Sequence, residues 1–327
     1  MKKIGIINVT SYSGLELLRI LGAHPEVEIT QVTGRSMAGE KLGDVFSFYN
    51  GNLVIQDELK ESVDLIFSCL PHKASAEIIG KFVNNGINTI DLSADFRLPV
   101  KLYESTYESK HPYPSLINKF IYGLPELNRN KIFSSKFISN PGCFPTCGTI
   151  PLIPLIGKDI VNVIIDAKTG ISGAGRSKKV DHNFSEISDN FSAYSLNGHR
   201  HEPEIENNLK LNLHLTTHLA PMVRGIFSTI YFQSYEKIDL KEYVNYFSEH
   251  PFVNVLNESP KVKDVRGTNN CNLFIQELKK NNDLNSYRII SVIDNLTKGA
   301  SGQAVQNMNL MFDFEETLGL NNMPLYP

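Results

Sequence analysis

The sequence predicts an α/β protein with two domains: a doubly wound parallel-sheet layer, followed by an α+β domain with a mixed or antiparallel sheet. Three observations support this fold class. The 327 residues are many for one core, so two domains are expected. Residues 1 to about 140 alternate strand-like and helix-like segments, which is typical of right-handed βαβ units. The later residues form longer β-branched strands with some alternation.

The elements of the first domain follow from hydrophobic periodicity and from the residues that end each segment. Strands are predicted over residues 2–9, 27–34, 62–71 and 87–95. Helices are predicted over residues 14–25 and 74–86, with stops at Gly22, Pro25 and Gly86. This alternation is what a parallel sheet with helical crossovers requires.

The second domain has a different pattern. Strands are predicted over residues 161–176, 225–235 and 287–296, with a helix over residues 240–250 between them. The tail over residues 300–314 has a helical spacing of apolar residues, at Ala304, Val305, Met308 and Met311.

Composition narrows the function classes. The net charge of −3, with no basic run, argues against nucleic acid as the main partner. No apolar run approaches the ~20 residues that span a bilayer, so no membrane association is expected. Four cysteines in a chain of this length are too sparse for a disulfide scaffold, which favours a reducing, cytoplasmic setting.

The first strand-to-helix turn has the spacing of a nucleotide loop. The stretch "GIINVTSYSG" places Gly5, Asn8, Ser11 and Gly14 at three-residue intervals, where backbone N–H groups can approach a pyrophosphate. Asn8 tolerates positive φ and Ser11 is small, although an ordinary turn remains the alternative. The motif favours a Rossmann-type domain.

The end of the second strand indicates which dinucleotide is bound. It reads "VTGRSMAG", with Arg35 and Ser36 and no acidic residue nearby. A guanidinium and a hydroxyl suit a 2′-phosphate, so NADP is favoured over NAD. The alternative is a solvated loop arginine.

The stretch "SNPGCFPT" places a cysteine in a turn. Gly142 permits close backbone approach and Pro145 suits the first turn of a helix, so Cys143 is predicted at a helix N-terminus. That position favours a thiolate and could stabilise an oxyanion on an attacked carbonyl. A turn cysteine that merely packs is the alternative, and packing is the role expected for Cys147.

A thiolate nucleophile needs an acid/base partner. The stretch "NGHRHEPEIE" offers His199 and His201 just before a predicted helix start. A zinc site is the competing interpretation, but no Cys-x-x-Cys or His-Glu-x-x-His accompanies the pair, so no metal is predicted. Two further loops, "TGISGAGRSKK" and "DLSADFRL", are either anion-binding or ordinary turns.

Seven stretches occur in the order found in one known family: "GLELLRILGAHPEVEI", "SNPGCFPT", "SGAGR", "FSEISDNFSAY", "GHRHEPEIE", "HLAPMVRGI" and "KGASGQAVQNMNLM". On these motifs the chain resembles the N-acetyl-γ-glutamyl-phosphate reductases of arginine biosynthesis, relatives of aspartate-semialdehyde dehydrogenase. The resemblance runs nearly end to end. It implies an NADP-dependent reductase of a small-molecule acyl phosphate that acts through a cysteine thioester.

The resemblance also implies roles for particular residues. Cys143 attacks the acyl phosphate, and a histidine of the HRH element, His201 before His199, transfers the proton. Arg97 and Asn140 are expected to contact the substrate. The residues expected to hold NADP(H) are Thr10, Ser11, Tyr12, Ser13, Gly34, Arg35, Ser36, Ser172, Gly173, Asn295 and Gln303.

By the same resemblance, residues 1–142 form the NADP-binding domain, completed by residues from about 296 to 327. Residues 143–295 form the catalytic and substrate domain, whose sheet joins subunits into a homodimer or homotetramer. The chain departs from the family at Asn8 and Ser11, which replace glycines, and at Pro151 and Pro154, which should kink or end the helix after Cys143.

Three other functions are compatible with parts of the sequence. A sister reductase of lysine biosynthesis acts on a carrier-bound aminoadipate phosphate, but the stretch "HNFSEISDNFSAY" favours the arginine enzyme. A cofactor-free cysteine hydrolase would not need the nucleotide loop. A non-catalytic nucleotide-binding sensor would not need Cys143 or the histidine pair.

Overall fold

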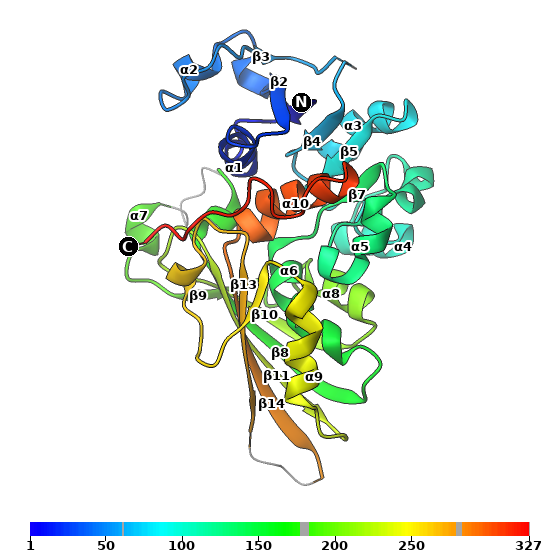
Figure 1. Ribbon diagram of the computed structural model, residues 1–327, viewed down its shortest axis with the longest axis vertical. Coiled ribbons are helices and arrows are strands. Elements are labelled where there is room, and N and C mark those ends of the chain that lie inside the picture. Colours follow the sequence, from blue (N-terminus) through cyan, green and yellow to red (C-terminus); the bar gives the residue numbers. More distant parts are fainter. Residues whose placement is uncertain (61, 177–182, 279–282, 327) are drawn as a thin grey trace. The chain divides into compact units, whose positions relative to one another are not determined.

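Each half of the chain builds its own sheet, as Figure 1 shows. The computed structural model describes residues 1–60, 62–176, 183–278 and 283–326. The chain divides into two units, which are described separately below. The first comprises Met1–Pro141 with Ala300–Asn321, and the second comprises Gly142–Gly299 with Asn322–Pro327.

Within the described residues, the first unit holds a seven-stranded sheet in the order β3-β2-β1-β4-β5-β7-β6, and every neighbouring pair is parallel. The predicted parallel sheet is therefore confirmed. The strand order reverses between β1 and β4, and ligands of such sheets bind beyond the carboxyl ends of the strands at that point. The strands are β1 Lys2–Ile7, β2 Val27–Thr33, β3 Ile55–Gln56, β4 Leu65–Ser68, β5 Asn88–Asp91, β6 Ile121–Tyr122 and β7 Phe137–Ser139.

Helices on both faces explain why these strands read as continuous apolar runs. All four residues of β4 are buried, and its Ile66 packs in one cluster with Ile79 and Phe82 of α3. The C-terminal helix α10 packs against α1 and α5 of the same unit (Figure 1). The helices of this unit are α1 Tyr12–Leu21, η1 Arg35–Met37, α2 Leu42–Val45, α3 Ala74–Asn84, α4 Val100–Tyr107, η2 Pro114–Lys119, α5 Pro125–Phe133 and α10 Gly302–Met311.

The second unit holds a mixed sheet, again of seven strands among the residues that the structure describes, in the order β12-β13-β14-β11-β8-β10-β9. The pairs β8–β10 and β12–β13 are parallel and the other pairs are antiparallel, so the predicted mixed sheet is confirmed. Its strands are β8 Ile160–Thr169, β9 Ser192–Tyr194, β10 Leu213–Leu219, β11 Ile226–Ser234, β12 Val253–Val255, β13 Cys271–Glu277 and β14 Asn285–Ile293.

One face of the mixed sheet is covered and the other is more open. Ser228 of β11 and its partner Ser291 of β14 are buried beneath α6. On the opposite face, Ile164 of β8 and its partner Tyr231 of β11 are 43% and 40% exposed. The remaining helices are α6 Cys143–Thr149, η3 Ile150–Leu155, η4 Ile171–Ala174, α7 Phe184–Ile187, α8 Glu202–Leu209, α9 Leu240–Tyr246, η6 Phe247–Glu249, η7 Val262–Asp264 and the π-helical turn η8 Thr297–Ser301.

The two prolines after Cys143 act as predicted. Helix α6 ends at Thr149, and the chain continues as the 3₁₀ segment η3, which contains Pro151 and Pro154. Proline lacks the N–H that would extend the α-helical bonding, so the tighter segment replaces it. No helix in the described part of the chain has the length and apolar character needed to cross a membrane.

Candidate active site

Cys143 is the first residue of α6, as the sequence predicted. Gly142 precedes it with extended backbone angles, and its carbonyl accepts both the N–H and the Oγ1–H of Thr146 at 2.9 Å. Pro145 has no N–H, so any oxyanion contact from this turn must come from Cys143 or Phe144. These backbone contacts fix the position of the Cys143 main chain at the start of α6.

The other cysteines are buried, whereas Cys143 is partly exposed. Cys147 contacts Ser228 and Ser291 through its sulfur at 3.3 and 3.4 Å, and burial raises its pKa to about 11. Burial likewise raises the pKa of Cys69 to about 12. The packing role predicted for Cys147 is confirmed, and Cys143 is the thiol that solvent and ligands can reach.

The two histidines lie side by side at the start of α8. Nδ1 of His199 accepts the backbone N–H of His201 at 3.1 Å, and the two ring centroids are 4.8 Å apart. Burial, with a smaller effect of the Arg200 charge, lowers the pKa of His199 to about 4. His199 is therefore neutral at pH 7, and because its Nδ1 is the acceptor, its ring proton is on Nε2.

Cys143 and both histidines line one cavity of about 910 Å³ in the second unit. Phe144 packs edge-on against both imidazoles, with ring centroids 5.3 Å and 6.0 Å apart. The cavity is large enough for a ligand with several functional groups. Its lining residues are Cys143, Phe144, Thr169, Gly173, Ala174, Glu186, Ile187, Asn190, Ser192, Ala193, Tyr194, Ser195, Gly198, His199, Arg200, His201 and Leu219.

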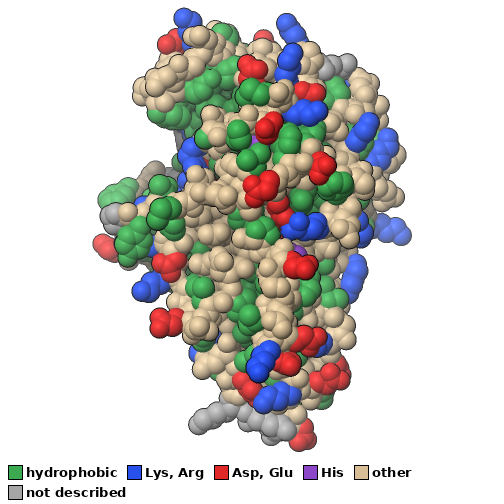
Figure 2. All heavy atoms as spheres, viewed as in Figure 1, with side chains coloured by type: hydrophobic (Ala, Val, Ile, Leu, Met, Phe, Trp, Pro, Cys, Tyr) green, Lys and Arg blue, Asp and Glu red, His purple; other side chains and the backbone are tan. Residues whose placement is uncertain are grey.

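The segment of residues 183–198 forms much of this lining and also carries exposed apolar side chains. Figure 2 shows hydrophobic side chains gathered around α7, where Phe184 is 87% exposed. Phe191 and Leu196 of the same segment are exposed as well. No group of His, Cys, Asp and Glu side chains within the described ranges is arranged to hold a metal ion.

Glu204 is a site residue that the sequence did not single out. Its side chain is 1% exposed and its Oε1 accepts the backbone N–H of Gly142 at 2.9 Å. It therefore holds the residue that precedes Cys143. In the sequence, an acidic residue in the first turn of a helix indicates only a favourable dipole interaction, and the partner lies 62 residues away.

Tyr194 was missed for a similar reason. It lies in the edge strand β9 and lines the cavity beside His199, with ring centroids 5.8 Å apart. Burial, and to a smaller extent the negative charge of Cys143, raise the pKa of its hydroxyl well above the ordinary value. The phenol thus stays protonated and can donate a hydrogen bond at neutral pH.

The predicted nucleotide turn has the required backbone. Asn8 has the positive φ of 62° that the sequence suggested it would tolerate. Ser11 caps α1 by accepting the N–H of Gly14 at 3.0 Å. A Cβ on Gly14 would lie 2.6 Å from the carbonyl oxygens of Asn8 and Val9, so only glycine lets the helix begin this close to the strand.

The predicted cofactor residues of the first unit lie at the carboxyl ends of β1 and β2 or in α10. Thr10 and Ser11 form the turn into α1, Tyr12 and Ser13 begin that helix, and Gly34 to Ser36 follow β2 directly. The Arg35 side chain falls outside the described part of the structure, as do Lys178 and Lys179 of the basic loop end. Gln303 is fully buried in the first turn of α10, and neither its Oε1 nor its Nε2 bonds to another described residue.

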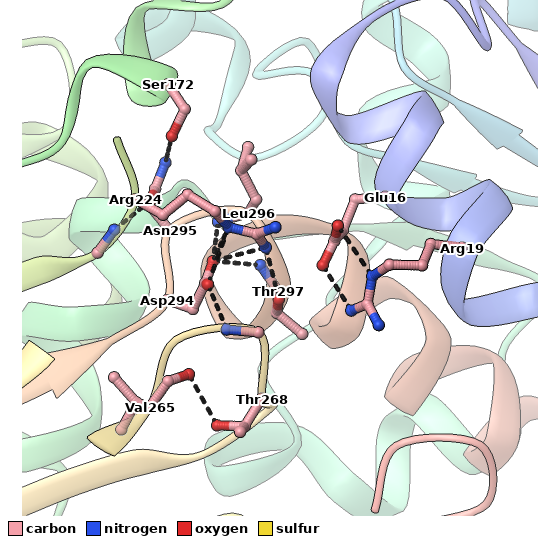
Figure 3. A network of polar contacts seen from close by, with 12 residues as sticks. Glu16, Arg19, Ser172, Arg224, Val265, Thr268, Asp294, Asn295, Leu296 and Thr297 are labelled. Carbon is pink, nitrogen blue, oxygen red and sulfur yellow. Dashed lines mark hydrogen bonds and ion pairs between the residues drawn. The ribbon is translucent and has the colours of Figure 1, made fainter. Parts of the chain in front are cut away.

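In the second unit, the predicted cofactor residues Ser172 and Asn295 are brought together (Figure 3). A Cβ on the third predicted residue, Gly173, would lie 3.8 Å from Nδ2 of Asn295. Asn295 donates to Oγ of Ser172 at 2.9 Å and accepts the N–H of Gly225 at 2.7 Å. Gly173 lines the cavity that contains Cys143. The amide of Asn295 is thus fixed from two sides.

The two predicted substrate residues lie in the first unit and are occupied by backbone contacts. Arg97 donates to the carbonyls of Asn140 and Leu92, both at 2.7 Å. Asn140 is fully buried, donates to the carbonyl of Ala300 at 3.0 Å and accepts from Asn307 at 3.1 Å. Both side chains therefore hydrogen-bond to other segments of the first unit. Their contact with the substrate stays a prediction.

Comparison with known proteins decides the family. The chain matches the models for the semialdehyde dehydrogenase NAD binding domain over residues 3–135 and the semialdehyde dehydrogenase dimerisation domain over residues 143–295. It is 43% identical to the N-acetyl-gamma-glutamyl-phosphate reductase of Dehalococcoides mccartyi strain 195, over 99% of both chains. The chain belongs to the N-acetyl-γ-glutamyl-phosphate reductase family.

A second relative extends this assignment over the full length. The N-acetyl-gamma-glutamyl-phosphate reductase of Geotalea daltonii is also 43% identical, over the whole of both chains. Among solved structures, aspartate semialdehyde dehydrogenase II of Vibrio cholerae has a TM-score of 0.75 at 15% identity, over 96% of this chain and 98% of that chain. This neighbour confirms the fold. Both relatives carry the name of the N-acetyl-γ-glutamyl-phosphate reductase, which favours this enzyme over the reductase of a carrier-bound aminoadipate phosphate.

Proposed function

We propose that the protein catalyses the NADPH-dependent reduction of N-acetyl-γ-glutamyl phosphate to N-acetylglutamate 5-semialdehyde, with release of phosphate. The observation that carries this proposal is the single cavity lined by Cys143, His199 and His201. It lies in a chain that is 43% identical over nearly its full length to proteins of that name.

The accessible thiol of Cys143 is the nucleophile. Its sulfur adds to the acyl carbonyl carbon, and the carbon–oxygen bond to phosphate breaks, so that a thioester and inorganic phosphate result. A bound dinucleotide would supply the hydride that reduces the thioester carbon. Reduction of the thioester would leave an oxyanion, which takes a proton to become a thiohemiacetal. Removal of that proton then lets the carbon–sulfur bond break, which gives the aldehyde and regenerates the thiolate.

His201 is the acid/base in this proposal, and His199 positions it. With a pKa near 4 and Nδ1 occupied by the N–H of His201, His199 does not exchange protons readily at neutral pH. It holds the turn from which the His201 ring reaches the same cavity as Cys143. His201 takes the thiol proton during attack and moves the hydroxyl proton of the thiohemiacetal.

The residues present fit a dinucleotide. The turn of residues 8–14 and residues Gly34 to Ser36 would hold its phosphates, and NADP is favoured because no acidic residue follows β2. The buried amide of Gln303 is the strongest sign of fit, since a donor and an acceptor without a partner among the described residues are costly unless a ligand satisfies them. Ser172, Gly173 and Asn295 would serve the nicotinamide end.

Arg200 supplies the positive charge of the cavity lining, and it would meet the anionic groups of the substrate. We further propose that the enzyme is a cytoplasmic homodimer or homotetramer. The open face of the mixed sheet, with Ile164 and Tyr231, offers the apolar surface for subunit contact. Four cysteines without a disulfide suit a reducing compartment.

The reverse reaction tests the proposal, because the acyl phosphate is labile. The protein is mixed with N-acetylglutamate semialdehyde, inorganic phosphate and NADP⁺, and NADPH formation is followed by absorbance. We expect phosphate-dependent turnover that Cys143→Ala abolishes and that the buried-cysteine control Cys147→Ala retains. A folded protein that binds NADP⁺ but produces no NADPH would reject this substrate assignment.

A further inference from the structure

The turn of residues 294–299 lies against Cys143 through its last residue, Gly299. A Cβ on Gly299 would lie 2.8 Å from Cβ of Cys143 and 3.3 Å from its Cα. Real Cβ atoms do not approach this closely, and neither Cys143 atom is the free end of a flexible side chain. Gly299 is absent from the glycines with positive φ, so close approach, and not backbone strain, requires glycine here.

Asp294 holds this turn in its conformation. The residue is fully buried, and its Oδ1 accepts the backbone N–H groups of Leu296 at 2.8 Å and Thr297 at 3.0 Å. Its Oδ2 accepts the N–H of Gly267 at 2.7 Å. The main-chain carbonyl of Asp294 accepts the N–H of Gly299 at 2.9 Å. One residue therefore bonds to the start, the middle and the end of the turn.

Arg224 stabilises the buried charge of Asp294, as Figure 3 shows. Its Nε lies 3.0 Å from Oδ2 of Asp294, and its second guanidinium nitrogen donates to Oγ1 of Thr297 at 3.0 Å. A buried carboxylate with a guanidinium and three backbone donors is well satisfied, and losing one partner is costly. The ion pair thus makes the turn rigid.

We propose that residues 294–299 form a backstop that fixes the position of the Cys143 side chain, with Asp294, Arg224 and Gly299 as positioning residues. The proposal rests on the function proposed above, in which Cys143 is the nucleophile. None of the three residues needs to touch the substrate. They act by setting where the thiol stands relative to the carbonyl that it attacks and to His201.

The size of the effect follows from the contact distance. An alanine at position 299 must move its Cβ from 2.8 Å to at least 3.4 Å from Cβ of Cys143 to reach ordinary contact. The displacement falls on Cys143 or on the turn, because both sides of the contact are close to backbone. The shift needed is about 0.6 Å, and because a misplacement of about 1 Å costs about 100-fold in rate, a loss on the order of 10- to 100-fold follows.

The test compares Gly299→Ala with Gly148→Ala. Gly148 lies in α6, the helix that Cys143 begins, but its added Cβ meets only the side-chain ends of Ile165 at 3.0 Å and Ile205 at 3.2 Å. It controls for general crowding without touching the nucleophile. The readouts are kcat and KM of the reverse reaction, thermal unfolding, and the rate of Cys143 alkylation by iodoacetamide between pH 6 and 9, followed by mass spectrometry.

For Gly299→Ala we expect kcat to fall roughly 10- to 100-fold with little change in KM, and Cys143 alkylation to need a higher pH than in the unchanged protein. Gly148→Ala should keep the alkylation profile. An unchanged profile together with a kcat no lower than that of Gly148→Ala would overturn the proposal. Because alkylation requires no substrate, failure of the proposed reaction would leave this comparison intact.

A second pair of variants covers the case in which Gly299→Ala does not fold. Thr297→Val keeps the shape of the side chain and removes the Oγ1 that accepts from Arg224, whereas Thr297→Ser keeps an oxygen there. We expect the valine variant to have the lower kcat and the shifted alkylation profile, and the serine variant to restore both. Equal behaviour of the two variants would contradict a positioning role for the turn.

Discussion

Removing the carboxylate of Glu204 should impair both folding and catalysis. In Glu204→Ala, the N–H of Gly142 loses an acceptor 2.9 Å away inside a buried site. A hydrogen bond to a charged group contributes about 1.5–3 kcal/mol, and a donor left buried without an acceptor incurs a similar cost. We therefore expect the free energy of unfolding to fall by about 2 kcal/mol.

The same lost hydrogen bond also affects the position of Gly142, the residue that precedes Cys143. If the restraint on Gly142 is needed equally in the transition state, about 2 kcal/mol corresponds to roughly a 30-fold lower kcat/KM. Glu204→Gln keeps an acceptor oxygen and should lose less. The assay is the phosphate-dependent reverse reaction, with urea unfolding of each variant measured beside it.

Glu206→Ala is the matched control. Glu206 lies two residues further along α8. Its Oε1 accepts the N–H of Leu213 at 3.2 Å, and Leu213 lies in β10 and not next to Cys143 in the chain. It should lose stability with little loss of kcat/KM. If Glu204→Ala and Glu206→Ala had the same kcat/KM, Glu204 would not position Cys143 and the reasoning would be refuted.

Three further predictions follow from the same geometry. Gln303→Leu should leave thermal stability unchanged or higher, because it removes a buried amide without partners among the described residues. The same variant should bind NADPH more weakly, as measured by fluorescence quenching. Unchanged NADPH affinity would contradict a cofactor role for Gln303. Because the folded-state pKa of His199 is lowered from 6.5 to about 4, the unfolded chain binds this proton first, so stability is lost as pH falls from 6.5 towards 4. The urea midpoint should drop less between pH 7.5 and pH 5 in His199→Gln than in the unchanged protein, and an equal drop would refute the assignment. Charged residues at both Ile164 and Tyr231 should reduce the particle mass in light scattering to that of a monomer, whereas an unchanged mass would exclude this face as the subunit contact.

The elements with strong local signals were predicted well from the sequence. The parallel strands of the first unit are buried on both faces and so read as apolar runs. Gly142 and Pro145 mark the start of α6, which placed Cys143 correctly. The apolar spacing of the C-terminal tail likewise predicted α10, although the helix is buried on all sides from Gly302 to Leu310 and not along one stripe only.

The parts that were missed depend on contacts between distant residues. Strand β9 has only three residues, two of them exposed, and exists because it pairs with β10 at the sheet edge. The contact of Glu204 with Gly142 and that of Gly299 with Cys143 join residues far apart in sequence. No periodicity or spacing encodes such pairs, since they form only when the tertiary fold brings two segments together.

Some chemically suggestive residues proved to have structural contacts. Arg97 and Asn140 are predicted from the sequence to contact the substrate. In the structure, Arg97 donates hydrogen bonds to the carbonyls of Asn140 and Leu92, and Asn140 donates to the carbonyl of Ala300. The neighbouring residues in the sequence do not indicate these contacts. An arginine after a strand looks the same in sequence whether it binds an anion or fastens a loop. Only the location of acceptors around it separates the two uses.

The central claim, covalent catalysis by Cys143, is tested most directly by leaving phosphate out of the reverse reaction. With semialdehyde and NADP⁺ alone, the thioester has no phosphate to accept the acyl group. The account predicts a rapid burst of NADPH, about one equivalent per active site, together with an acyl adduct on the Cys143 peptide after acid quenching. Phosphate-dependent turnover without a burst or an adduct would contradict it.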